Sequence, residues 1–152
     1  DLHLHAPQYT FRASGMDLEL LDWLNTYTFP QEARYEDTEF AKEAYSIFTE
    51  DMKKSPNTRA CIFGTLHVPA TEILMEQLDK TGIKAMVGKV NIDRNGSARL
   101  QEESAQVSAD ATVQWIEDTL DKFENVKPIL TPRFTPSCSD ALMEKLSEIE
   151  KK

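Results

Sequence analysis

The apolar and polar residues of this chain follow two periods that alternate along the sequence. Short apolar or alternating runs of strand length occupy residues 2–5, 60–66, 85–90 and 126–131. Apolar residues at three- and four-residue spacing predict helices over residues 17–27, 38–54, 69–82 and 108–124, and a last helix that opens at residues 137–140 and continues to the end of the chain. The polar segment 28–37, which contains Pro30, is predicted to be a turn.

Residues at the ends of these helices support the assignment. Asp17 and Ser108 precede periodic runs and are predicted N-caps. Pro69 stands near the start of one helix and Gly82 just beyond its end, which is the usual asymmetry. The segment 137–140 resembles a capping box. The faces predicted to be buried are Leu20, Trp23, Leu24 and Tyr27; Phe40, Ala44, Ile47, Phe48 and Met52; Thr71, Leu74, Met75 and Leu78; Val113, Ile116, Leu120 and Phe123; and Leu142, Leu146 and Ile149.

The repeated order of strand then helix predicts an α/β protein with parallel strands. A doubly wound sheet and part of an eight-stranded barrel both fit this order. No G-x-G-x-x-G follows any strand, which removes the main support for a dinucleotide-binding sheet. A barrel needs ~250 residues and eight βα units. We therefore predict a single domain over residues 1–152 that forms a partial (β/α)8 TIM barrel of about four units.

Composition and charge narrow the possible partners. The chain has 152 residues, is 40% hydrophobic and 28% charged, and carries a formal net charge of −9. This charge argues against a nucleic-acid partner, because phosphate binding needs clustered Lys and Arg. No apolar run approaches the ~20 residues that cross a bilayer, and the polar N-terminus does not resemble a signal peptide. Two distant cysteines, Cys61 and Cys138, are expected to be free thiols of a cytoplasmic protein.

Polar or aromatic residues follow each predicted strand. They are His5 and Gln8, His67, Asn91 and Asp93, and Arg133 and Phe134. Because the carboxyl ends of parallel strands face one crevice, these side chains are expected to converge there. His3 and His5, two residues apart on a strand, point to the same side and could bind a metal.

Each of these residues also has an ordinary structural interpretation. The two histidines could simply be solvated or packed. His67 could form a hydrogen bond at the start of a helix, and Asn91 and Asp93 could be turn residues. Arg133 could form an ion pair on the surface, and Phe134 could be an ordinary packing residue.

Five segments together resemble the guanine deaminases, a family of zinc enzymes in the amidohydrolase superfamily. They are "DLHLHAPQY", "LLDWLNTYTFP", "GKVNIDRN", "VKPILTPRF" and "PSCSD". The resemblance implies a metal-containing barrel in which His3 and His5 are zinc ligands. It also implies that Gln8, Arg133 and Phe134 bind the purine. The implied reaction converts guanine and water to xanthine and ammonia by attack of zinc-activated hydroxide, as part of purine catabolism.

The chain does not contain all the zinc ligands and catalytic residues that this family uses. It has three histidines, and the family gives no role for His67. A further histidine, an aspartate and the proton-shuttling glutamate are expected beyond Lys152, so no catalytic residue is assigned here. Because both ends look cut, we expect a fragment of a longer enzyme. Two other possibilities remain: a homodimer that pairs two open edges, or an inactive fragment that binds purines or partners.

Overall fold

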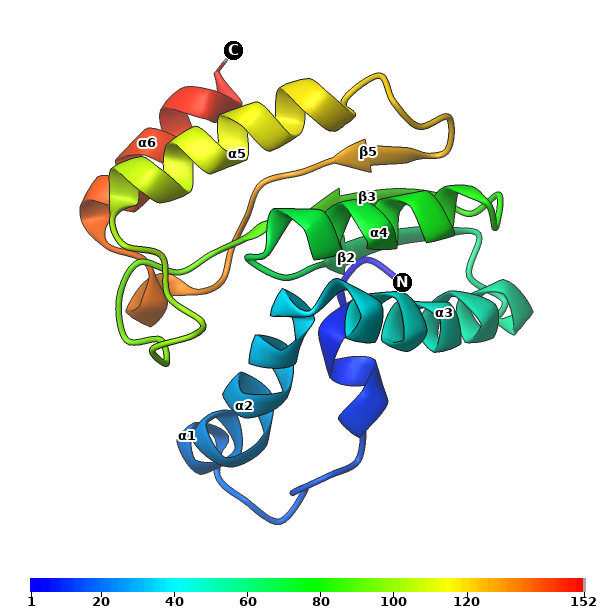
Figure 1. Ribbon diagram of the computed structural model, residues 1–152, viewed down its shortest axis with the longest axis horizontal. Helices are drawn as coiled ribbons and strands as arrows, with labels where there is room; N and C mark the ends of the chain where they lie inside the picture. The colour runs from blue at the N-terminus through cyan, green and yellow to red at the C-terminus, as the bar shows by residue number, and fades with distance from the viewer. Residues whose placement is uncertain (152) are drawn as a thin grey trace.

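A computed structural model describes residues 1–151 and contains a parallel sheet of order β1-β2-β3-β5 (Figure 1). Its strands are β1 (Leu4–His5), β2 (Arg59–Phe63), β3 (Lys84–Gly88) and β5 (Val126–Pro128). A second parallel pair joins β4 (Val90–Asn91) to β6 (Thr131–Pro132). The predicted α/β class with parallel strands is confirmed.

Helices follow the strands in the order that the pattern predicts. The α-helices are α1 (Leu20–Trp23), α2 (Phe29–Glu32), α3 (Thr38–Lys54), α4 (Val68–Asp79), α5 (Ala105–Thr119) and α6 (Asp140–Glu150). Shorter segments are the 3-10 helices η1 (Ala6–Phe11), η3 (Ala33–Glu36) and η4 (Thr135–Ser137), and the π-helix η2 (Leu24–Thr28). No helix within residues 1–151 is long and apolar enough to cross a membrane.

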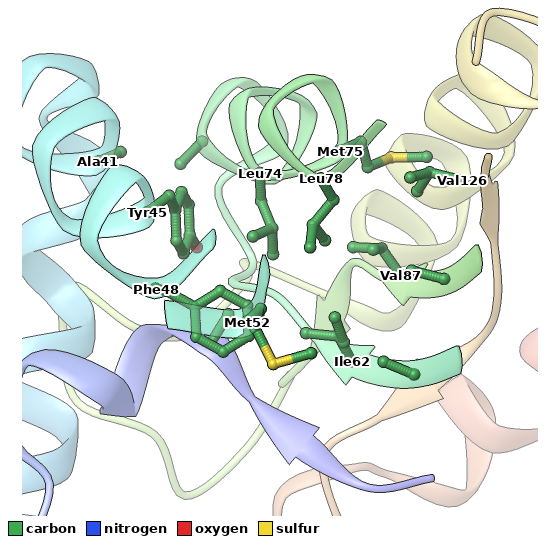
Figure 2. Close-up of a cluster of buried hydrophobic side chains, with 14 of the residues drawn as sticks. Ala41, Tyr45, Phe48, Met52, Ile62, Leu74, Met75, Leu78, Val87 and Val126 are labelled. Carbon is green, nitrogen blue, oxygen red and sulfur yellow. The ribbon is translucent and has the colours of Figure 1, made fainter. Parts of the chain in front are cut away.

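The main core lies between one face of the sheet and helices α3 and α4. Figure 2 shows Tyr45 and Phe48 of α3 and Leu74 and Leu78 of α4 pointing toward the strands. Ile62 on β2 lies in the same core and is fully buried. The alternation of the strands thus determines which side chains enter the core.

The opposite face of the sheet is open. Every second side chain of β2 and β3 points to this face. Cys61 and Phe63 are half-buried there, and Met86 is 50% exposed. The register places His5 beside Phe63, while Leu4 pairs with Ile62 and packs against the core. His5 of β1 therefore projects from the open face, and so does His3, which precedes the strand.

A close approach between two chain segments occurs where β3 gives way to β4. A Cβ atom added to Gly88 would lie 2.1 Å from Thr131 Oγ1, so only glycine fits beside this threonine. The Thr131 hydroxyl donates to the Lys89 carbonyl in the same place. This contact brings the residues after β6 next to the end of β3.

The segment between Leu20 and Glu36 differs most from expectation. Glu19, not Asp17, occupies the N-cap of α1, and its side chain makes no capping hydrogen bond. The predicted turn at 28–37 is wrong, because the chain remains helical there through α2 and η3. Pro30 lies inside this run, directly after the junction where the π-helix η2 gives way to α2.

Other boundaries and faces also need correction. Ser104, not Ser108, caps α5, and Ser108 is buried. Ile47 is 53% exposed and Leu120 is 47% exposed, so neither enters the core as predicted. Leu20 is likewise exposed. The predicted faces of α4 and the buried leucines of α6 are confirmed.

Candidate active site

The two N-terminal histidines lie together on the open face of the sheet. His3 precedes β1 and His5 ends it, and their Nε2 atoms are 3.2 Å apart. Phe63 of β2 contacts both rings, with centroid distances of 5.0 Å to His3 and 4.6 Å to His5. Both imidazoles therefore present one nitrogen to the same point in space.

This donor pair fits a metal ion. Two nitrogen ligands at zinc–nitrogen distances of about 2.05 Å in a tetrahedral site are separated by about 3.3 Å. Burial, then the charge of Arg133 and then that of His3, lower the pKa of His5 to about 4. His5 is consequently neutral at pH 7, the state in which an imidazole ligates a metal.

Gln8 joins the histidines through the 3-10 helix that follows β1. Pro7 stands in the first turn of η1, and this tight turn begins directly after His5. The Gln8 amide nitrogen lies 3.5 Å from His5 Nδ1 and donates to Glu32 Oε1 at 3.0 Å. The side chain is therefore beside the candidate metal site and is held from a second element, α2.

Arg133 reaches the same place from the far end of the chain. It follows β6, and its Nη1 donates to Glu32 Oε2. The side chains of Arg133 and Glu32 are 5% and 3% exposed, which makes this a buried ion pair. Arg133 also lies over Phe29, with its Cζ atom 5.6 Å from the ring centroid. The predicted convergence of the first strand and the segment after the last strand is present in the structure.

Glu32 is the residue of this cluster that the sequence pattern did not indicate. It lies in a segment predicted to be a turn, where a glutamate is expected to be solvated. In the structure it is 2% exposed and contacts both Gln8 and Arg133. The sequence feature that could have pointed to Glu32 is its position two residues after the distinctive "TYTFP" segment.

Phe134 is half-buried and packs against a small cluster beside the site. The buried members of that cluster are Leu24, Phe29, Val90, Ile92 and Leu100. The cluster joins η2 and α2 to β4, and Phe134 directly follows Arg133 in the chain.

Asn91 and Asp93 have structural roles. Asn91 is fully buried and donates its amide to Ser108 Oγ and Thr112 Oγ1, both at 2.8 Å. Asp93 accepts hydrogen bonds from the backbone N–H and hydroxyl of Ser139, the N-cap of α6. Neither side chain makes a hydrogen bond to His3, His5, Gln8 or Arg133 within residues 1–151, so their convergence on the site stays a prediction.

His67 stands at the N-cap of α4 without a capping hydrogen bond from its side chain. Its Nε2 atom is buried and has no hydrogen-bond partner among the described residues. The expectation that it bonds a helix start is therefore wrong. Within residues 1–151, no group of three or more His, Cys, Asp or Glu side chains is arranged to hold a metal ion.

The parallel α/β fold agrees with the comparisons to known proteins. The Amidohydrolase family profile matches residues 1–152, so the chain belongs to the amidohydrolase family, a family of metal-dependent hydrolases. It is 45% identical over 152 residues to guanine deaminase of Rattus norvegicus and 41% identical to that of Homo sapiens. Each match covers 99% of this chain and 34% of the relative, so the chain spans about a third of their length.

Solved structures show the same relationship. A crystal structure of guanine deaminase from C. acetobutylicum with bound guanine superimposes with a TM-score of 0.95 at 46% identity. The match covers 99% of this chain and 36% of that one. E. coli guanine deaminase gives a TM-score of 0.86 at 33% identity, over 99% and 34% of the two chains. The predicted partial barrel and the predicted resemblance are confirmed.

Proposed function

We propose that this chain carries the purine-binding side and two metal ligands of a guanine deaminase, which releases ammonia from guanine to give xanthine. The observation that supports this most strongly is the single cluster formed by His5, Gln8 and Arg133. Arg133 is joined to Gln8 through Glu32, although 101 positions separate Arg133 from Glu32. Guanine deaminases of Rattus norvegicus and C. acetobutylicum match this chain over 99% of its length at 45% and 46% identity.

In this proposal His3 and His5 hold a zinc ion. A bound zinc ion lowers the pKa of its water to ~7, which makes a strong nucleophile available at neutral pH. His5 is suited to ligation because its low pKa keeps the ring unprotonated. Phe63 holds both rings in place by contact, so that their nitrogens stay directed at one point.

Gln8 and Arg133 hold the base. Arg133 offers only donors, so it binds acceptor atoms of the purine, and Gln8 can supply an acceptor oxygen. Phe134 contributes an apolar wall. With a wrong base these buried polar groups would remain unpaired, and that penalty produces specificity.

The test is conversion of guanine to xanthine by the complete product of the gene, with zinc content measured in the same sample. We expect zinc-dependent release of ammonia that is lost in His3→Ala together with bound zinc. His67→Ala is the matched control, because it removes a histidine outside the cluster, and it should retain activity. Full activity in His3→Ala would refute the proposal.

A further inference from the structure

We infer that Glu32 is a positioning residue of this site that sets which hydrogen-bonding groups Gln8 and Arg133 present to a ligand; this inference rests on the proposed function. Glu32 is the last residue of α2, and its side chain is 3% exposed. Its two oxygens have different partners. Oε1 accepts from Gln8 Nε2 at 3.0 Å, and Oε2 accepts from Arg133 Nη1.

The contact with Glu32 determines the orientation of the Gln8 amide. A glutamine side chain can present either its NH₂ group or its oxygen to a ligand. A carboxylate accepts hydrogen bonds and does not donate them, so it selects the NH₂ group of Gln8. The amide oxygen is then the group of Gln8 that remains for a ligand.

The same contact balances the charge of Arg133. This guanidinium is 5% exposed, and a buried cation without a partner carries a large desolvation cost. With Glu32 present, the ion pair is already neutral as a whole, and among residues 1–151 the other N–H groups of the Arg133 side chain have no hydrogen-bond partner. A neutral base can then bind without having to supply the missing negative charge.

The resulting pair, a donor from Arg133 and an acceptor from Gln8, recognises a base that carries an acceptor next to an N–H. Guanine has this arrangement in its O6 and N1–H. 2-Aminopurine carries the same amino group at C2 but has neither O6 nor N1–H. Glu32 should therefore determine how strongly the site prefers guanine over 2-aminopurine.

The experiment compares kcat/KM for guanine and for 2-aminopurine in the complete gene product and in Glu32→Gln. The substituted amide keeps the shape of Glu32 but turns a donor toward Gln8 or Arg133. We expect KM for guanine to rise about tenfold or more with a smaller change in kcat, since hydrogen bonds to charged groups are worth about 1.5–3 kcal/mol. The preference for guanine should fall by a similar factor, at unchanged zinc content.

Glu102→Gln is the matched control. Glu102 forms the other buried ion pair of the described residues, with Lys89, and contacts neither Gln8 nor Arg133 in the hydrogen bonds of residues 1–151. It should lower the melting temperature and leave the preference for guanine unchanged. If Glu32→Gln does the same, Glu32 is only structural and the inference is wrong.

Three further results are decisive. If Glu32→Gln does not fold, Glu32→Asp keeps the charge but is too short to hold both partners, and it should lower the same preference. An unchanged preference in Glu32→Asp would overturn the inference. Absence of guanine turnover by the unsubstituted protein would refute the proposed function, and with it this role for Glu32. Normal turnover with an unchanged preference would refute the role of Glu32 alone.

Discussion

The imidazole of His5 stacks on the phenyl ring of Phe63, with an interplanar angle of 17° and 4.6 Å between the ring centroids. The parallel register that sets His5 opposite Phe63 produces this contact. His3 meets the same phenyl ring at 56°. One aromatic side chain on β2 thus orients both candidate ligands on β1.

Replacing Phe63 should weaken metal binding without removing a ligand. In Phe63→Leu the two imidazoles lose the flat surface against which they pack, so their nitrogens are less well ordered. We expect zinc affinity to fall by about tenfold, the lower end for residues that orient metal ligands. Competition with a chelator measures this affinity. Phe48→Leu, a substitution in the main core, should cost stability only, and an equal loss of zinc in both variants would contradict this role for Phe63.

The core between the sheet and α4 should dominate the stability of this segment. Leu74 is fully buried, so Leu74→Ala should lower the free energy of unfolding by about 2–5 kcal/mol. Ile47→Ala, at a position 53% exposed, should cost less than about 1 kcal/mol. Urea denaturation of both variants measures the two costs. Equal costs would show that α3 buries Ile47, against the observed packing.

The stability should also depend on pH through His67. Burial is the largest influence on its pKa and lowers it below 6.5, with Glu36 opposing the shift. As the pH falls below about 6.5, the unfolded chain takes up a proton that the folded protein resists, and unfolding becomes easier.

His67→Gln removes this titration. We expect its urea midpoint to fall less steeply between about pH 7 and pH 5 than that of the unsubstituted protein, while His5 titrates equally in both. Parallel curves would show that His67 takes up its proton as readily in the folded protein as in the unfolded chain.

Local signals in the sequence predicted the strands and the helices α3, α4 and α6 because those elements have clear periods and ends. Local signals do not determine the start of α5, because Ser104 and Ser108 are one helical turn apart and both can cap. Tertiary contacts determine which serine is the N-cap. The Ser108 hydroxyl accepts a hydrogen bond from the buried Asn91, and the Ser104 hydroxyl caps α5 by accepting from the backbone N–H of Val107. The mixed helix over residues 20–36 has no simple period, since it combines α, π and 3-10 turns.

Part of the site followed from the order of strands and part did not. His5 and Arg133 were predicted to meet because both follow strands of a parallel sheet. Glu32 follows no strand, and its role depends on contacts with Gln8 and Arg133 that are 24 and 101 positions away. Such a buried pair leaves no periodic trace in the sequence.

The most direct test is a crystal structure of the complete gene product grown with zinc and guanine, with anomalous scattering recorded at the zinc edge. We predict one anomalous peak bonded to the Nε2 atoms of both His3 and His5, with guanine in contact with Gln8 and Arg133. A zinc peak away from these histidines, or guanine bound at a place that Arg133 does not reach, would contradict the account.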